Sequence, residues 1–234
     1  MLRLNKEKVK LRNYQEKTLG EIIDKNSFIV LPTGAGKTII AVALSAIKLS
    51  AGKVLIMAPT KPLVAQHKKS FDNFFDNSEL IGLVDGTIKS ELRKNIWLES
   101  DLIIATPQTV LSDLEKNYFD LEKFSLIVFD EAHRASGNYA YSKLMEHVEK
   151  SQILAMSASP ATDKERLDEL KSILKIEKFH IVESEEMSEY LPEREIKIKK
   201  IKLNKIQLEI KKMLTAMIRD DYAILKKNRL VVRN

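Results

Sequence analysis

The segment FIVLPTGAGKT, residues 28–38, decides the fold class of this chain. A short apolar run, 28–31, leads directly into Thr33-Gly34-Ala35-Gly36-Lys37-Thr38. Small residues between a strand and a helix let successive backbone N–H groups turn toward an anion, while Lys37 can reach phosphates and the Thr38 hydroxyl can bind Mg²⁺. The general phosphate-loop pattern has a glycine where this chain has Leu31. A strand-to-helix turn with tightly packed glycines is therefore the alternative interpretation.

The pattern of an apolar run that ends in a polar loop recurs along the chain. The runs 54–58, 102–105, 126–129 and 153–156 are continuous rather than alternating, which is typical of strands buried on both faces. The intervening segments, most clearly 39–49 and 62–75, are long enough for crossover helices. The sequence therefore predicts an α/β fold, a parallel sheet with helices on both faces. Ligands of such sheets bind at the carboxyl ends of the strands, which here read LPTGAGKT, APT, ATPQ, DEAH and SAS.

The acidic pair Asp130-Glu131 follows one of these runs and opens the segment DEAH. One carboxylate at a strand end can hold Mg²⁺ opposite Thr38, and a second can polarise an attacking water. We assign Asp130 to the metal, through a bound water, and Glu131 as general base. Together with Lys37 they are the candidate catalytic residues. Taken alone, the segment also fits an acidic loop with a hydrogen-bonded histidine.

The phosphate loop and the DEAH segment together resemble the motifs of superfamily 2 helicases, and the resemblance extends over residues 10–162. Arg12-Asn13-Tyr14-Gln15 resembles the adenine-recognising motif of that family, and 31–38 is the family's usual form of the loop. The resemblance implies a RecA-like lobe that binds ATP and Mg²⁺. It also implies that Gln15 reads the adenine edge while Arg12 lies along the ring.

Further segments resemble the family's nucleic-acid motifs. Residues 58–63 with Gln66 resemble motif Ia, and residues 105–108 resemble motif Ib. Residues 82–86 stand where the family has a glycine-containing loop that contacts the nucleic-acid backbone, although the usual Thr-Gly-Glu is replaced here. The resemblance assigns nucleic-acid contacts to Pro59, Thr60, Lys61, Gly86, Thr106 and Gln108. Such contacts to phosphates fix the register without reading sequence. An ordinary role at a helix N-terminus is the alternative for each, and the two roles can coexist.

The segment Ser157-Ala158-Ser159-Pro160 resembles motif III. In the family this segment and the DEAH histidine couple the nucleotide site to the nucleic-acid path, a role that falls here on His133, Ser157 and Ser159. A strand end that closes the sheet is the alternative. The sequence Ser-Ala-Ser-Pro resembles motif III in the branch of the superfamily that contains archaeal Hef, Fanconi-anaemia M, Dicer and innate sensors. Similarity to the Hef type implies action on branched or forked DNA.

The pattern changes after residue 161. Residues 163–174 read as a helix, and 195–203 alternates apolar and basic residues like a strand with one wet face. Asn204 can cap a further helix, whose apolar face comprises Ile206, Ile210, Met213, Leu214, Met217, Ile218, Tyr222 and Leu225. We therefore expect an ATP-binding lobe at 1–183, a linker and strand at 184–203, and the start of a helical insertion at 204–234 that continues beyond Asn234.

Composition narrows the class of protein. The 234 residues include no cysteine, which excludes disulfides and thiolate metal sites, and the four histidines form no spaced ligand cluster. Neither a signal-peptide core nor a membrane-spanning run is present. Residues 195–234 hold 12 Lys or Arg against 4 Asp or Glu, which fits either phosphate contact or a solvated helix face. We expect a cytoplasmic, nucleoid-associated protein from a prokaryotic or archaeal source.

The predicted function is that of the ATP-binding lobe of an ATP-dependent helicase or translocase acting on DNA. Its partners are nucleic acid and a second RecA-like lobe, without a membrane. Because the family's arginine-bearing segment Gln-x-x-Gly-Arg-x-Gly-Arg does not occur here, we expect this chain alone to bind nucleotide but to hydrolyse it slowly or not at all. Three alternatives stay open: an RNA helicase or duplex-RNA-activated ATPase, a restriction-enzyme motor subunit, and a nucleotide-switched binding module without catalysis.

Overall fold

The structure is a computed structural model that describes residues 2–135, 139–159, 164–182, 187, 190 and 202–227. The chain divides into two compact units, Met1–Pro192 and Glu193–Asn234. The first unit contains the sheet and all of the predicted site residues.

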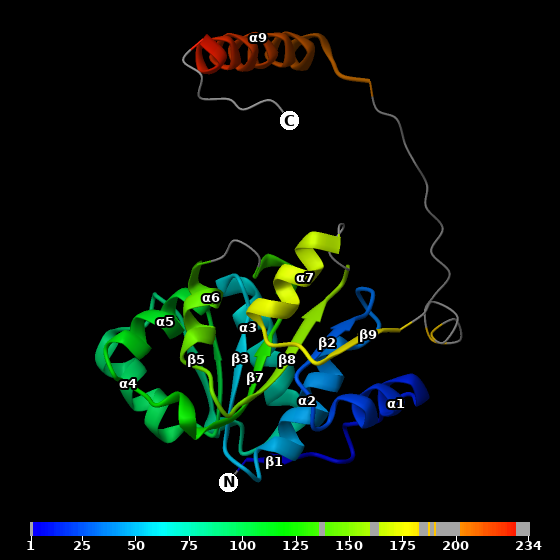
Figure 1. Cartoon of the computed structure of the whole chain (residues 1–234), viewed down its shortest axis with the longest axis vertical. Coiled ribbons are helices and arrows are strands. Elements are labelled where there is room, and N and C mark those ends of the chain that lie inside the picture. The colour runs from blue at the N-terminus through cyan, green and yellow to red at the C-terminus, as the bar shows by residue number, and fades with distance from the viewer. Residues whose placement is uncertain are drawn as a thin grey trace. The chain divides into compact units, whose positions relative to one another are not determined.

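Seven parallel strands form the main sheet of the first unit, in the order β5-β6-β3-β7-β8-β2-β9 (Figure 1). Their bounds are β2 (Ser27–Val30), β3 (Lys53–Met57), β5 (Ile81–Val84), β6 (Leu102–Ala105), β7 (Phe124–Phe129), β8 (Gln152–Ser157) and β9 (Lys178–Ile181). The five strands predicted from continuous apolar runs are confirmed to within two residues at each end. A separate antiparallel pair joins β1 (Arg3–Leu4) to β4 (Phe75–Asp76).

Helices cover both faces of the sheet, as the crossover pattern predicts. One face packs against α1 (Asn13–Ile22), α2 (Lys37–Lys48) and α3 (Lys61–Phe74), and the other against α4 (Ser90–Glu99), α5 (Pro107–Glu115), α6 (Tyr139–Glu146) and α7 (Lys164–Ile173). The described part of the unit also contains three short 3₁₀ helices: η1 (Ser78–Leu80), η2 (Leu121–Lys123) and η3 (Ala132–Arg134). Val54 and Ile56 of β3 enter one core while Leu55 and Met57 enter the other. This alternation explains why the run is apolar without interruption.

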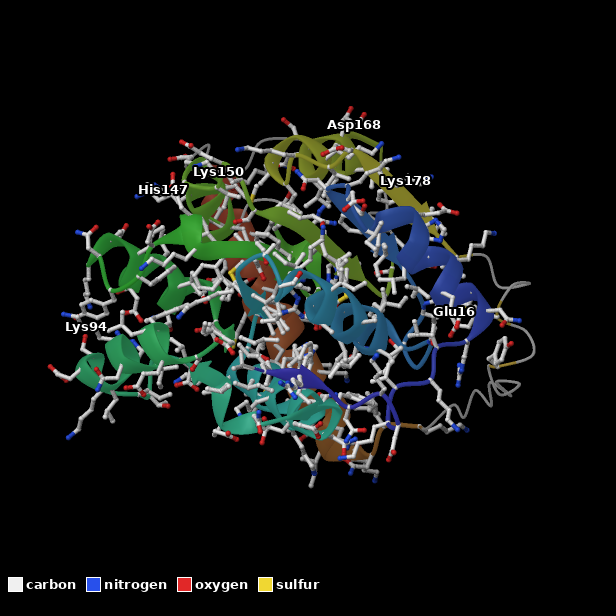
Figure 2. The ribbon with its side chains drawn as sticks, turned by 90° about the horizontal axis from the view of Figure 1, so that it is seen from below. Glu16, Lys94, His147, Lys150, Asp168 and Lys178 are labelled. Carbon is white, nitrogen blue, oxygen red and sulfur yellow. The ribbon has the colours of Figure 1, made fainter. Side chains whose placement is uncertain are left out.

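Polar side chains of the outer helices point away from the two cores. Glu16 of α1, Lys94 of α4 and Asp168 of α7 lie at the periphery of the unit (Figure 2). The surface of the helices is thus solvated in the ordinary way.

One expectation about the sheet was wrong. The segment 82–86 was expected to be a loop, but Gly82, Leu83 and Val84 belong to β5, which adds a strand beyond those predicted. A Cβ atom at Gly82 would overlap side chains of Ile96 and Ser100. The glycine therefore allows close packing of a helix on the strand, and only the end of the segment, at Gly86, is exposed at the sheet edge.

The described part of the second unit is dominated by α9 (Lys205–Lys227). Asn204 caps it as predicted, because the Asn204 Oδ1 accepts from the Gln207 amide at 2.9 Å and the Gln207 side chain accepts from the Asn204 amide at 3.0 Å. Every residue of the predicted apolar face is at least 42% exposed. Most of the predicted strand 195–203 lies outside the described residues, and Leu203 is not in a strand. Within the described residues, no helix has the length and apolar character to cross a bilayer.

Candidate nucleotide and nucleic-acid sites

The order of the strands sorts the predicted site residues into two groups along one edge of the sheet. The phosphate loop follows β2, Asp130 and Glu131 follow β7, and Ser157 ends β8 with Ser159 just beyond it. These three strands belong to the β7-β8-β2 half of the sheet. The residues predicted to contact nucleic acid follow β3, β5 and β6, which are neighbours in the other half. Because parallel strands deliver their carboxyl ends to the same edge, the two groups lie beside each other.

The phosphate loop owes its shape to two glycines. Gly34 and Gly36 have φ angles of +87° and +81°, in the left-handed region that residues with a Cβ atom rarely adopt. Gly36 is the N-cap of α2, so the first N–H groups of that helix open into the loop. The α2 N-terminus therefore offers backbone donors and the positive end of a helix dipole, which is the arrangement that binds phosphate.

Lys37 stands at the first position of α2 and is half-buried. Its Nζ donates a hydrogen bond of 3.0 Å to the carbonyl of Leu31. Burial lowers the pKa of Lys37 below its ordinary value, while the negative charges of Asp130 and Glu131 act in the opposite direction. The lysine thus lies between the loop and the acidic pair, where it can contact a bound anion.

A cavity of about 410 Å³ brings the loop and the acidic pair together. Its walls are formed by Thr33, Gly34, Gly36, Lys37 and Thr38 from the loop, Leu63, Gln66 and His67 from α3, and Asp130 and Glu131 after β7. The described residues hold no cluster of three or more histidine and acidic side chains that could cage a metal. One hydroxyl and one carboxylate are nevertheless the donor set that Mg²⁺ uses when phosphates and water complete its shell.

Glu131 adopts a strained backbone conformation. Its φ of +50° and ψ of +43° lie in the left-handed region, at the N-cap of η3. A non-glycine residue there costs on the order of 1–3 kcal/mol, and such residues cluster at functional sites. The side chain lies in the cavity wall and is partly exposed. The strain supports the assignment of Glu131 to the chemistry of this site.

His133 forms a contact between the acidic pair and the end of β8. Its Nδ1 lies 2.9 Å from Ser157 Oγ and 3.3 Å from the Glu131 carboxylate. The Ser157 hydroxyl is also 2.7 Å from the carbonyl of Ser159, whose amide lies 3.3 Å from Ser157 Oγ. The structure therefore brings together all three residues that were predicted to couple the two sites.

The adenine motif lies against the outer side of the phosphate loop. Gln15 is only 3% exposed, and its Nε2 donates to the Ala35 carbonyl at 3.1 Å while its Oε1 accepts from the Arg12 amide at 2.9 Å. The Arg12 guanidinium lies 5.1 Å from the centre of the Tyr190 ring. Gln15 thus supports the loop, and reading of the adenine edge by Gln15 stays a prediction.

The residues predicted to contact nucleic acid occupy helix N-termini or turns. Thr60 is the N-cap of α3 and its hydroxyl accepts from the Leu63 amide at 3.5 Å, so the alternative capping role is realised. Thr106 is the N-cap of α5 and is buried, with its hydroxyl 2.9 Å from that of Thr109. Lys61, Gly86 and Gln108 are exposed, and Pro59 is half-buried. Contact with phosphates stays a prediction for all six.

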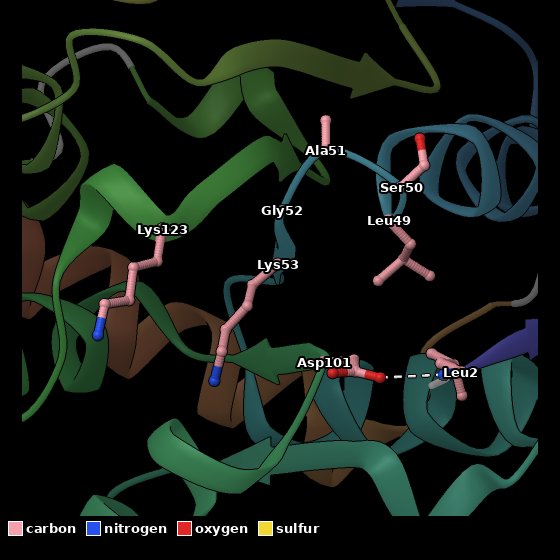
Figure 3. A pocket seen from close by; sticks show the side chains of 8 residues that line it. All are labelled: Leu2, Leu49, Ser50, Ala51, Gly52, Lys53, Asp101 and Lys123. Atoms are coloured by element: carbon pink, nitrogen blue, oxygen red, sulfur yellow. Dashed lines mark hydrogen bonds between the residues drawn. The ribbon is translucent and has the colours of Figure 1, made fainter.

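A second cavity, of about 390 Å³, lies near the amino-terminal end of β3 (Figure 3), whereas the motifs stand at the carboxyl ends of the strands. Lys53 Nζ, at its edge, donates to the carbonyls of Trp97 and Leu98 at 2.7 and 2.9 Å. Asp101 accepts from the Leu2 amide at 2.9 Å. Because these charged groups are used in contacts within the protein, the cavity carries no sign of a ligand site.

Three residues to which no sequence motif assigns a role lie at the nucleotide site. His67 contacts Asp130, the Tyr14 hydroxyl donates to the Ala35 carbonyl at 2.6 Å, and Tyr190 packs on Tyr14 with 5.6 Å between ring centres. Tyr14 adjoins Gln15 in the sequence and could have been found from that position. His67 lies two turns beyond Thr60 on the same helix. This spacing does not predict a contact with Asp130 until the position of the helix beside β7 is known.

Comparison with known proteins agrees with the fold. Residues 8–162 match the family described as "Type III restriction enzyme, res subunit". The ATP-dependent DNA helicase MPH1 of Scheffersomyces stipitis is 36% identical over 197 residues, which are 80% of this chain and 19% of that protein. MPH1 of Saccharomyces cerevisiae is 34% identical over 186 residues, 76% of this chain and 18% of that protein.

The solved Hef helicase domain of Pyrococcus furiosus has the same fold, with a TM-score of 0.78 and 36% identity, over 97% of this chain and 50% of that one. The fold and the arrangement of motifs define a RecA-like, phosphate-loop lobe. The chain belongs to the family described as "Type III restriction enzyme, res subunit", and it forms a first RecA-like lobe of the superfamily 2, Hef type. It spans less than a fifth of the length of these fungal relatives and half of the solved Hef chain.

Proposed function

We propose that this chain is the ATP-binding lobe of an ATP-dependent DNA helicase or translocase, with branched or forked DNA as its substrate. The observation that carries the proposal is the cavity in which the phosphate loop, Lys37, Asp130 and Glu131 meet. The names of the relatives, ATP-dependent DNA helicase and Hef helicase domain, support DNA as the substrate.

In the proposed mechanism, the loop N–H groups and Lys37 offset the charge of the triphosphate. Mg²⁺, held by Thr38 and, through water, by Asp130, would neutralise further phosphate charge. Glu131 orients the water for in-line attack on the γ-phosphate. Arginines of a second lobe would stabilise the charge that develops during transfer, which is worth roughly 10³–10⁵ in rate in related systems. This chain alone therefore binds nucleotide and turns it over slowly or not at all.

The nucleotide part of the proposal can be tested on this chain. A fluorescent ATP analogue is expected to bind in the presence of Mg²⁺, and Lys37→Ala is expected to abolish that binding while the circular dichroism spectrum stays unchanged. Lys94→Ala, on the exposed surface of α4, is the matched control and is expected to bind as the wild type does. Equal binding by the Lys37→Ala variant would contradict the assignment of the phosphate loop.

The substrate part requires a protein that also contains the second lobe. Forked DNA is expected to stimulate its ATP hydrolysis more than linear duplex DNA or duplex RNA does. Stronger stimulation by duplex RNA would replace DNA with RNA as the substrate. Rapid nucleic-acid-stimulated hydrolysis by the 234-residue chain alone would contradict the need for a second lobe.

The C-terminal helix supports a further part of the proposal. We assign residues 1–183 to the lobe, 184–203 to a linker and 204–234 to the start of a helical insertion. The capped helix α9 carries an exposed apolar face, and such a face needs helical partners to be buried. A DNA substrate would place the protein at the nucleoid, in the cytoplasm of a prokaryotic or archaeal cell.

A further inference from the structure

His67 has no role in the mechanism proposed above, although it lies in the wall of the nucleotide cavity. It belongs to α3, the helix that begins at the predicted nucleic-acid segment Thr60–Lys61. Its side chain is buried, with 7% of the residue exposed. A buried polar side chain at this place needs a partner, and the partner identifies its role.

The partner of His67 is the metal-ligand candidate itself. His67 Nε2 lies 2.7 Å from Asp130 Oδ2, and the two side chains are 9% and 8% exposed. An ionised carboxylate only accepts hydrogen bonds, so the His67 Nε2–H is the donor. The Asp130 amide also donates to the Met57 carbonyl at 2.9 Å. The sheet thus holds the backbone of Asp130, and His67 holds one of its two carboxylate oxygens.

The two neighbouring carboxylates have separate histidine contacts. His133, from η3, lies against Glu131 and Ser157, whereas His67, from α3, contacts Asp130. The contact of His133 extends toward β8 and that of His67 toward the N-terminus of α3. The two histidines therefore connect the acidic pair to different parts of the lobe, and the connection through α3 leads to the strands that carry the predicted nucleic-acid contacts.

The helix between the two ends of this connection is well suited to act as a rigid element. Thr60 caps its first turn, and Val64 and Phe71 are fully buried against the sheet. Thr60 and His67 are seven positions apart, which along an α-helix is a distance of about 10 Å. A shift of the packed helix at Thr60 must therefore also move His67.

We propose that His67 is a positioning residue, which orients the Asp130 carboxylate for the metal and transmits occupation of the Thr60–Lys61 segment to it through α3. This proposal rests on the proposed function and adds a connection that bypasses His133. Loss of the hydrogen bond would leave the nucleotide contacts of the loop in place but would release the carboxylate. The effect should therefore appear in the Mg²⁺ dependence of nucleotide binding rather than in binding without metal.

The test uses this chain, the fluorescent ATP analogue and a titration with Mg²⁺. His67→Leu retains apolar bulk without a donor, and His67→Gln retains an amide N–H near the position of Nε2. The Leu variant is expected to need about 10-fold more Mg²⁺ for half-maximal enhancement of binding, the size typical for loss of a group that orients a metal ligand. The Gln variant is expected to stay within about 3-fold of the wild type, because it restores the donor. His147→Leu, on the exposed surface of α6 and its following turn, is the control (Figure 2).

The possible results separate the two proposals. Absence of nucleotide binding by the wild type would contradict the proposed function. Wild-type binding with an unchanged Mg²⁺ midpoint in His67→Leu would overturn the role of His67 alone. If the Leu variant fails to fold, His67→Asn, whose shorter side chain does not reach Asp130, serves in its place. In the protein with both lobes, DNA is expected to lower the Mg²⁺ concentration needed for half-maximal enhancement of binding in the wild type and the Gln variant. No such shift is expected in the Leu or Asn variant. An equal shift in all four proteins would overturn the transmission through α3.

Discussion

Three glycines form a matched series that tests the geometry of the phosphate loop. Gly20 lies within α1 at an exposed position, and an added Cβ atom would meet nothing within 4 Å. Gly34 has a positive φ of +87°, and its added Cβ would also meet nothing within 4 Å. Gly36 has a φ of +81°, and its added Cβ would overlap Nε2 of Gln15. Alanine at the three positions therefore separates helix propensity, backbone strain and steric overlap.

The expected changes in the free energy of unfolding follow from these differences. Gly20→Ala should stabilise the protein by about 0.5–1 kcal/mol, because alanine is the better helix former. Gly34→Ala should destabilise it by about 1–2 kcal/mol, which is the cost of a left-handed conformation for a residue with Cβ. Gly36→Ala has the same strain and also displaces the buried Gln15 from the Ala35 carbonyl. A buried polar group without its partner costs about 1–3 kcal/mol, so the sum is about 2–5 kcal/mol.

Urea denaturation followed by circular dichroism measures these changes, with the slope of the transition checked for constancy. Nucleotide binding by the fluorescent analogue is expected to be lost in Gly36→Ala, because the backbone that opens toward the phosphates is distorted. A Gly36→Ala variant as stable as Gly34→Ala would show that Gln15 does not press on the loop. A Gly34→Ala variant as stable as the wild type would refute the positive φ angle itself.

The remaining predictions concern three other groups. Asp113 is fully buried and accepts hydrogen bonds from Arg93 at 2.7 and 2.8 Å, so Asp113→Ala should lower the free energy of unfolding by about 3–5 kcal/mol. Truncation of the exposed Glu122, which pairs with Lys150, should change the free energy of unfolding by less than about 1 kcal/mol. Equal effects of the two substitutions in denaturation would contradict the buried pair. Burial raises the pKa of Asp85. Hydrogen bonds from the amide and the hydroxyl of Thr87 outweigh that effect and keep the pKa of Asp85 below its ordinary value. The stability that this carboxylate contributes is thus complete at neutral pH and is lost as the pH falls through the lowered pKa. Asp85→Asn should flatten the acid side of a stability profile below about pH 5, and an unchanged profile would argue against the contribution. Lys37→Arg, which retains the charge but not the compact ammonium, should weaken binding of the ATP analogue by at least about 10-fold at constant stability, and wild-type affinity would show that only the charge matters.

Local sequence patterns were sufficient for most of the fold and for the candidate chemistry. The runs that became β2, β3, β6, β7 and β8 are apolar throughout because both of their faces are covered, and that property is visible in each run by itself. The strands β5 and β9 were not predicted. The sequence IGLV contains a glycine that serves helix packing, and KFHI of the edge strand is only partly buried and carries polar residues.

The sequence by itself determined which residues can bind phosphate, hold a metal and activate water, because loop glycines, a lysine and paired carboxylates carry those properties wherever they stand. Only the tertiary structure decided the order β5-β6-β3-β7-β8-β2-β9, which separates the predicted nucleic-acid residues from the nucleotide residues along one edge. It also decided the contact of His67 with Asp130, 63 positions away, and the position of Gln15 against Ala35. The physical reason is that backbone turns and burial depend on near neighbours, whereas a hydrogen bond between distant residues depends on how the helices pack on the completed sheet.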